Sequence, residues 1–484
     1  MTNASRPARR FLVPVVVALL LVAATQVVSA FFGRPDDPAA TAEVPQLPAP
    51  AFSTSGPAPD AAVLQRKVDA ALEDSPGTVE VSVVDAVTGK QVAHVGEGEA
   101  LIPASSLKVL TGTAVVSTLG LEDQWVTRTV LDKRGSGAPV VWLVAGGDVM
   151  LNPGASDAKA VNGRAGLKTL AEQTAKELKA SGALDEADGS LKVGVDTRMF
   201  TGPALNPDWA DDLVSTNNVT EIAPIALYAG RSEASHTSPV VRNPDEHALE
   251  VFTGHLQSAV KSGKKSVEVK QASGKTKPGF DAVDPFEPGS VEGQLAAVHS
   301  ATVREQLAYG EAHSDNVILE TYGRLVGIKR GHEGSTQGAI EGVKQALEEL
   351  GVETNELVMR DTSGLSDKNR VQAGTLADVM ALTLNDGSAS QPARRDLAFV
   401  PSLLPRAGVN GTMETRLDGK KTKALVLAKT GTLADVISLT GVVTTKEGRP
   451  LGFSIIFNDV EGNLDAARAS ADAVATALAD CGCQ

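Results

Sequence analysis

Three short motifs that lie far apart in the sequence constrain the fold more than any other feature of this chain. They read Ser-Ser-Leu-Lys from Ser105 to Lys108, Ser-Asp-Asn from Ser314 to Asn316, and Lys-Thr-Gly-Thr from Lys429 to Thr432. Together they supply a nucleophile, a base, a proton relay and an anion-binding strand, the groups that acyl transfer through a serine ester requires. These groups can act together only if residues 209 and 115 positions apart meet in the fold.

The first motif predicts the nucleophile and its base. Ser105 and Lys108 are three residues apart and lie on one face of a helix, whereas Ser106 points elsewhere. At a usual pKa of about 10.4 almost every lysine is protonated at pH 7, so Lys108 can act as a base only if its pKa falls by about three units. Burial and a second cation, Lys429, would lower it. We therefore expect the two lysines to lie close together, with Ser105 as the nucleophile.

The second motif predicts a proton relay and a substrate contact. Ser314 can pass a proton between Lys108 and the leaving amine. Asn316 carries an amide that both donates and accepts hydrogen bonds, which suits a peptide-like substrate. We therefore assign Ser314 to catalysis and Asn316 to substrate binding.

The third motif predicts a site for a substrate carboxylate. Lys429 provides a cation and Thr430 a hydroxyl, and Gly431 would let the substrate backbone come close. The backbone N–H groups of Ser105 and Thr432 are expected to form the oxyanion hole. All four residues of this motif, including Thr432, are thus expected to contact substrate.

The first 32 residues are expected to direct export. Three arginines precede an apolar run of 20 residues, from Phe11 to Ala30. This run is long for a signal-peptide core and just long enough to span a bilayer, so residues 1–32 are either a cleaved signal peptide or a membrane anchor. In both cases the flanking arginines favour the cytoplasm, and the rest of the chain is exported. The predicted location is extracytoplasmic, secreted or anchored to the cell membrane.

Two further segments near the ends of the chain carry little hydrophobic pattern. Residues 33–60 are rich in Pro and Ala and are expected to form an extended linker. Cys481 and Cys483 lie too close in sequence to staple a fold. We expect a frayed tail with little effect on the core; a strained local disulfide and a pairing with another chain are the alternatives.

The composition excludes several classes of partner. The chain has 484 residues, 42% of them hydrophobic, which is enough for two or more domains with real cores. Its net charge is -14 and it has no large basic run, so nucleic acid is not an expected partner. Its seven histidines show no zinc-site spacing. No metal and no cofactor are therefore expected.

Hydrophobic periodicity predicts an α/β fold, of the α+β kind, with one domain inserted into another. Outside the insertion, strands are expected at residues 79–85, 438–444 and 451–457, and helices at 103–120 and 464–478. Inside it, strands at 140–144 and 191–195 alternate with helices at 167–178 and 247–260. The prediction is a core of residues 61–126 and 277–484, in which helices flank an antiparallel sheet in three layers, and an inserted α/β domain of residues 127–276.

Several segments together match a known family. They run from Pro103 to Lys108, Ala145 to Asp148, Asp361 to Arg370, Gly408 to Thr412 and Lys429 to Thr432. With them the chain resembles the class C low-molecular-mass penicillin-binding proteins, the D-alanyl-D-alanine carboxypeptidase/endopeptidase family, over residues 61 to 480. Thr362 stands where this family usually has glycine, a departure that we expect to be tolerated.

The resemblance implies a serine transpeptidase/β-lactamase-like core and a substrate. The substrate would be peptidoglycan stem peptides ending in D-Ala-D-Ala, cleaved through an acyl-enzyme on Ser105, with β-lactam antibiotics as covalent inhibitors. The balance between carboxypeptidase and endopeptidase activity stays open. Two alternatives are a β-lactamase, distinguished by fast deacylation, and a catalytically silent cell-wall-binding protein.

Overall fold

The computed structural model describes residues 52–53, 55–133, 139–186, 190–261, 268–272, 277–287, 289–384 and 396–482. The predicted export segment lies outside this part of the chain, as do most of the predicted linker and Cys483. Among the described residues, no helix combines the length and the apolar character needed to span a bilayer.

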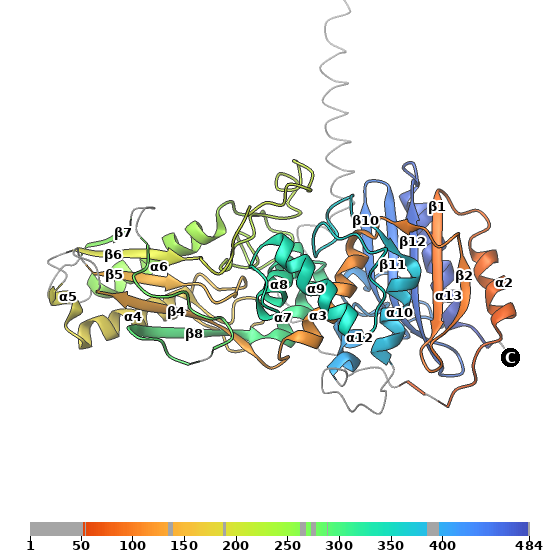
Figure 1. Ribbon diagram of the computed structural model, residues 1–484, viewed down its shortest axis with the longest axis horizontal. Helices are drawn as coiled ribbons and strands as arrows, with labels where there is room; N and C mark the ends of the chain where they lie inside the picture. Colours follow the sequence, from red (N-terminus) through yellow and green to blue (C-terminus); the bar gives the residue numbers. More distant parts are fainter. Residues whose placement is uncertain are drawn as a thin grey trace, which may run out of the picture.

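The central sheet joins strands from the two ends of the chain (Figure 1). Its order is β10 (Val426–Leu433), β11 (Val436–Thr444), β12, β1 and β2 (Lys90–Val95), and every neighbouring pair is antiparallel. In its middle, β1 (Thr78–Asp85) pairs with β12 (Pro450–Asn458) along its whole length. The first strand of the folded chain therefore depends on the last strand for its hydrogen bonds.

Helices on both faces of this sheet complete three layers. α2 (Ala61–Ala71) and α13 (Leu464–Ala479) pack on one face, in an apolar core that includes Val83 of β1. α10 (Ala373–Leu384) packs on the other face, against Val84 of the same strand. Neighbouring residues of β1 face opposite helices because side chains alternate along a strand. The predicted three-layer core is confirmed.

The elements expected from periodicity are present with small differences at their ends. The two strands predicted near the C-terminus are β11 (Val436–Thr444) and β12, which form an antiparallel hairpin. The remaining elements of the core are β2 (Lys90–Val95), β3 (Ala100–Leu101), η2 (Ala104–Leu107), α3 (Lys108–Thr118), α7 (Val303–His313), α8 (Asn316–Lys329), α9 (Thr336–Glu349), β9 (Val371–Gln372), η3 (Leu397–Phe399), α12 (Val400–Leu403), η4 (Gly411–Met413) and β10 (Val426–Leu433).

A second sheet lies at the far end of the molecule, beyond the cluster of α3, α7, α8 and α9 (Figure 1). Its strands, in order, are β7 (Glu268–Gln271), β6 (Ser190–Asp196), β5 (Val140–Val144), β4 (Gln124–Asp132) and β8 (Gln294–Thr302). β5, β6 and β7 are parallel to one another, whereas β4 is antiparallel to both of its neighbours. α4 (Leu167–Ala180) and α6 (Pro244–Lys261) cover one face through a separate apolar core, and the short α5 (Ala183–Glu186) follows α4.

The insertion predicted as residues 127–276 is too short for this sheet. β4 begins at Gln124, and β8 lies beyond residue 276 yet pairs with β4 up to Thr302 opposite Gln124. Periodicity did not indicate β8 because its sequence, Gln-Leu-Ala-Ala-Val-His-Ser-Ala-Thr, mixes small and polar residues and gives a weak hydrophobic pattern. The second sheet therefore ends only where α7 begins.

Part of the predicted insertion leaves its own sheet. Residues 197–243 follow β6, and Val219 and Ile222 of this segment are buried in the same apolar core as side chains of α3 and α8. The segment thus packs on the helices that carry the first and second motifs. Ile225 and Leu227 of the same segment are buried in the apolar core of the second sheet, so the segment packs on both cores. Sequence separation alone assigned it wholly to the insertion.

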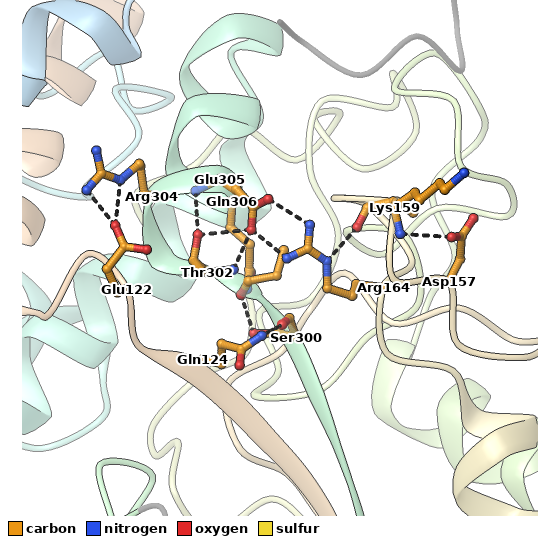
Figure 2. Close-up of polar contacts among 12 residues, drawn as sticks. Glu122, Gln124, Asp157, Lys159, Arg164, Ser300, Thr302, Arg304, Glu305 and Gln306 are labelled. Atoms are coloured by element: carbon orange, nitrogen blue, oxygen red, sulfur yellow. Dashed lines mark hydrogen bonds and ion pairs between the residues drawn. The ribbon is translucent and has the colours of Figure 1, made fainter. Parts of the chain in front are cut away.

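Polar contacts hold the start of α7, which follows β8 directly (Figure 2). Thr302 and Glu305 form a capping box, in which the Thr302 N–H donates to Glu305 Oε2 at 2.9 Å and the Glu305 N–H to Thr302 Oγ1 at 3.3 Å. Arg164, from the insertion, donates two hydrogen bonds of 2.6 and 2.7 Å to the same carboxylate. The insertion is therefore fixed to the helix that leads into the second motif.

The end of the predicted linker is part of the folded core and is not an extended tether. The Asp60 side chain caps α2 by accepting from its backbone at 2.9 Å. Gly56 is buried, and a Cβ there would lie 2.8 Å from Glu447 O, so the missing side chain lets this segment reach the turn between β11 and β12. The Gly56 carbonyl also accepts from Arg449 Nη1 at 3.0 Å.

The C-terminal cysteine region also differs from the prediction. Cys481 is 1% exposed and belongs to the apolar core between α13 and the central sheet. It is disulfide-bonded. A frayed tail with little effect on the core is therefore wrong for Cys481, because the residue follows α13 closely and packs with it.

Arg449→Ala is expected to destabilise the core strongly. Arg449 Nε and Nη2 donate to the two carboxylate oxygens of Asp85 at 2.8 and 2.7 Å, and the side chains are only 7% and 2% exposed. Removing one partner leaves a buried charge without compensation, which costs about 3 to 5 kcal/mol. Lys421→Ala, which breaks the exposed pair with Asp480, should change the stability far less, because water screens this pair. Denaturant unfolding measures both, and equal small losses would show that the Arg449 pair does not stabilise the fold.

Candidate active site

The first motif lies in a 3₁₀ turn that leads into α3. Ser105 is in η2 and Lys108 is the first residue of α3, so the spacing of three residues brings them to one face. Lys108 Nζ lies 3.0 Å from Ser105 Oγ. Ser105 is partly exposed, whereas Ser106 is fully buried. The geometry thus pairs Lys108 with the serine that a substrate can reach.

The turn before Ser105 is held in an unusual backbone conformation. Ala104 has a φ of 48°, in the left-handed region that costs a residue with a Cβ roughly 1 kcal/mol or more. A Cβ on Gly364 would lie 1.9 Å from Ala104 O, so only glycine allows this close approach. The segment that follows Asp361 is thereby packed directly against the turn.

Lys108 is fully buried, and its Nζ makes three hydrogen bonds. Besides Ser105, its Nζ donates to Asn316 Oδ1 and to the Ser363 carbonyl, both at 2.6 Å. Asn316 Nδ2 donates in turn to the Asn218 carbonyl at 2.8 Å. Asn316 therefore holds the lysine in the free enzyme, while the substrate contact expected of its amide stays a prediction.

The second and third motifs meet at a second buried lysine. Lys429 Nζ donates to Ser314 Oγ and to the Thr430 carbonyl, both at 2.9 Å. Ser314 ends α7 with a φ of 55°, which turns the chain sharply between α7 and α8. The lysine bonded to Ser314 is thus Lys429, whereas Lys108 is bonded to Ser105. All three motifs converge on one place.

Burial lowers the pKa of both lysines. For Lys108 it lowers the pKa to about 8, although nearby carboxylates, first of all Glu311, partly oppose it. For Lys429 burial again acts most strongly, and the positive charge of Lys108 adds to it and lowers the pKa to about 7. Of the two causes that we expected to lower the pKa of Lys108, burial is therefore the main one. At a pKa of about 8, about a tenth of Lys108 is neutral at pH 7.

The third motif lies on the edge strand β10, beside the turn that carries Ser105. A Cβ on Gly431 would lie 2.1 Å from Ser438 Oγ and 2.9 Å from Pro103 O, and Ser438 donates to that carbonyl at 2.6 Å. Contacts within the protein therefore already exclude a side chain at position 431. The close approach of a substrate backbone, which we expected to require this glycine, is a separate reason. Thr430 Oγ1 lies 2.9 Å from Thr412 Oγ1, and Thr432 is exposed. The oxyanion hole expected from Ser105 and Thr432 stays a prediction.

Asp361 organises the loop that supplies the Ser363 carbonyl. Its carboxylate accepts from the backbone N–H groups of Gly364 and Ser366, and from the side chains of Asn369 and Trp209, at 2.7 to 2.9 Å. This segment matched the family pattern, but its contact with Lys108 runs through a backbone carbonyl. The sequence therefore singled out this loop, but it did not predict that a backbone carbonyl of the loop accepts a hydrogen bond from Lys108.

Thr362, which stands where the family usually has glycine, fits because Gly323 leaves room for its side chain. Thr362 is fully buried and its hydroxyl donates to the Leu319 carbonyl at 3.2 Å. A Cβ on Gly323 of α8 would lie 2.4 Å from Thr362 Oγ1, so Gly323 provides the room that the larger side chain needs. Elsewhere in the described ranges, no group of three or more His, Cys, Asp or Glu side chains is placed to hold a metal ion.

A serine and a buried lysine at the start of a helix, beside the edge of a helix-flanked antiparallel sheet, define the class of serine transpeptidase and β-lactamase-like enzymes. The model of the D-Ala-D-Ala carboxypeptidase 3 (S13) family matches residues 64–278 and 232–480. The chain therefore belongs to this family, which confirms the predicted resemblance and the prediction of a D-Ala-D-Ala carboxypeptidase.

Similar proteins support this membership over most of the chain. Carboxypeptidase DacB of Mycolicibacterium smegmatis is 30% identical over 489 residues, which cover 97% of each chain. The D-alanyl-D-alanine carboxypeptidase of Actinomadura sp. strain R39 is 29% identical and covers 91% of this chain and 90% of its own. Penicillin-binding protein 4 of Haemophilus influenzae is 18% identical, with a TM-score of 0.62 over 81% of this chain and 93% of its own, which confirms the predicted fold.

Proposed function

We propose that this chain is a serine-type D-Ala-D-Ala carboxypeptidase that acts through an acyl-enzyme on Ser105. The observation that carries the proposal is the distance of 3.0 Å between Ser105 Oγ and the Nζ of Lys108, a lysine with no exposed surface. A lysine whose pKa burial lowers to about 8 can take a proton near neutral pH.

In this scheme Ser105 Oγ attacks the carbonyl carbon of the penultimate D-Ala while its proton passes to neutral Lys108. The bond from that carbon to the nitrogen of the terminal D-Ala then breaks, and the proton taken up by Lys108 passes through Ser314 to the leaving nitrogen. Water attacks the resulting ester and restores the serine. Lys429 and Thr430 hold the terminal carboxylate of the substrate, and Asn316 bonds the peptide.

Substrate binding also sets which lysine carries a proton. In the free enzyme the pKa of Lys429 is lowered further than that of Lys108. A substrate carboxylate beside Lys429 would raise the pKa of Lys429, because an opposite charge favours the charged form. The proton then moves toward Lys429 and leaves Lys108 neutral when the substrate is in place.

The proposed substrate is the peptidoglycan stem peptide, encountered outside the cytoplasm. Residues 1–32 would deliver the chain there, either as a cleaved signal peptide or as a membrane anchor. β-Lactams would acylate Ser105 as substrate analogues; the penicillin-binding protein 4 of Haemophilus influenzae, at a TM-score of 0.58, has been solved with a β-lactam. An endopeptidase activity on cross-linked peptides would use the same serine.

The test combines labelling with turnover on the full folded chain. We expect a fluorescent penicillin to label the protein covalently and a stem-peptide mimic to lose its terminal D-Ala. Rapid turnover of penicillin without D-Ala release would favour a β-lactamase. If the folded protein is not labelled and does not release D-Ala, the result would favour a catalytically silent cell-wall-binding protein. Cleavage of a cross-linked dimer, compared with the monomer, measures the endopeptidase share.

A further inference from the structure

A buried carboxylate beside the two lysines has no part in this scheme. Glu311 is 1% exposed and lies on α7, three residues before Ser314. Its Oε2 has no hydrogen-bond partner among the residues that the structure describes. A buried carboxylate without hydrogen bonds is costly unless a charge compensates it.

The position of Glu311 places it against the helix of the first motif. Its Oε1 would lie 2.9 Å from a Cβ on Gly112, and Gly112 is one helical turn after Lys108 on α3. A glycine inside a helix costs about 1 kcal/mol relative to alanine, and here the missing Cβ leaves room for the carboxyl group. The carboxyl group thus lies on the Lys108 side of α3, while its own helix ends at the serine bonded to Lys429.

The other carboxylates near Lys108 already have hydrogen-bond or ion-pair partners. Asp361 accepts from four donors. Asp315 caps α8 and lies 3.7 Å from the Arg231 side chain, and Glu320 accepts from a backbone N–H at 3.0 Å. Among these four groups Glu311 is the one whose charge acts on both lysines. Burial raises the pKa of Glu311 to about 7, while the positive charges of Lys429 and Lys108 oppose this rise.

We propose that Glu311 is a positioning residue whose carboxylate is the counter-charge of the Lys108–Lys429 pair. When the pair holds a single proton and Glu311 is ionised, the two lysines and this carboxylate together carry no net charge. That state contains the neutral lysine that Ser105 needs and the cationic lysine that the substrate carboxylate needs. This inference rests on the proposed function of the same site.

The test is the pH profile of kcat/KM for D-Ala release by Glu311→Gln. In the wild type, the acid limb reports loss of the first proton from the lysine pair and the basic limb reports loss of the second. Without the carboxylate both protons are held less tightly, so both limbs should move to lower pH by about one unit or more. If Glu311 only supports the fold, the variant should have a lower kcat/KM at every pH, with the acid and basic limbs at the same pH as in the wild type. That result would overturn the inference.

Two variants separate charge from folding. Asp148→Asn removes another buried carboxylate, 1% exposed and bonded to the Met150 N–H at 2.9 Å, so it should leave both limbs where they are. Glu311→Asp keeps the charge and should keep the limbs near those of the wild type. Should Glu311→Gln fail to fold, ¹³C NMR of labelled glutamate carboxyls, assigned by the signal missing from Glu311→Asp, decides: an ionised Glu311 at the pH of maximal activity supports the inference and a protonated one overturns it.

The two proposals fail in different ways. A wild type that neither binds penicillin covalently nor releases D-Ala contradicts the proposed function, whatever Glu311 does. A wild type that does both, with unmoved limbs in Glu311→Gln, contradicts only the role of Glu311.

Discussion

Replacing Ser105 with alanine is expected to abolish covalent labelling by penicillin and to lower the rate of D-Ala release by about 10,000-fold or more. The nucleophilic oxygen is lost, so no acyl-enzyme can form. Water would have to attack the peptide directly, with help only from the groups that bind it. Because Ser105 is partly exposed and its hydroxyl bonds only Lys108 among the residues that the structure describes, the fold should persist. Fluorescent-penicillin gels and thermal unfolding measure the two effects.

Ser106→Ala is the matched control, because it removes the same atom one residue away. Ser106 is fully buried, so the loss of its hydroxyl should leave labelling in place. Labelling that survives in Ser105→Ala and disappears in Ser106→Ala would assign the nucleophile to Ser106 and contradict the assignment made from the spacing of three residues. Loss of labelling in both variants, with both folded, would show that the turn as a whole is sensitive to change.

The sequence predicted the meeting of the three motifs because their chemistry depends on side chains. Ser105 and Lys108 are identified by type and spacing, and each of the other motifs contributes a residue with a defined chemical use. The structure pairs them differently in detail, with Ser314 bonded to Lys429 and Asn316 bonded to Lys108. A motif says which groups are present, but the partner of each group depends on how helices and strands pack.

The features that the sequence did not predict depend on backbone atoms or on long-range packing. The carbonyls of Ser363 and Asn218 complete the surroundings of Lys108 and Asn316, and a carbonyl has no signature in a sequence. The segment 197–243 returns to the helical core although it lies inside the insertion. Glu311 had a weak signal: an acidic residue one turn before Ser314, in a helix whose neighbour α3 carries an interior glycine.

Lys108→Met is expected to slow acylation by about 1,000-fold or more, since a positioned general base contributes about 100-fold to 10,000-fold. Methionine nearly fills the volume of lysine, so the cavity left behind is small. In the wild type the rate should rise with pH up to about 8, the pKa to which burial lowers that of Lys108, because only the neutral amine can accept the proton of Ser105, and it should fall at higher pH as the lysine pair loses its second proton. The variant should lose this rise together with most of its rate. Stopped-flow acylation by a chromogenic β-lactam from pH 6 to pH 9 measures both quantities.

The control for Lys108→Met is Lys344→Met, which removes a lysine of α9 that donates to the Leu357 carbonyl at 3.1 Å and does not belong to the Lys108–Lys429 pair. It should keep both the rate and its pH dependence. If Lys108→Met acylates slowly but retains the rise near pH 8, the base that titrates is another group, and Lys429 is then the first to test because it is the other buried lysine of the site. A shallow dependence on pH in both the wild type and Lys108→Met would instead mean that proton transfer from Ser105 does not limit acylation. The pH profile therefore tests the identity of the base separately from the size of its contribution.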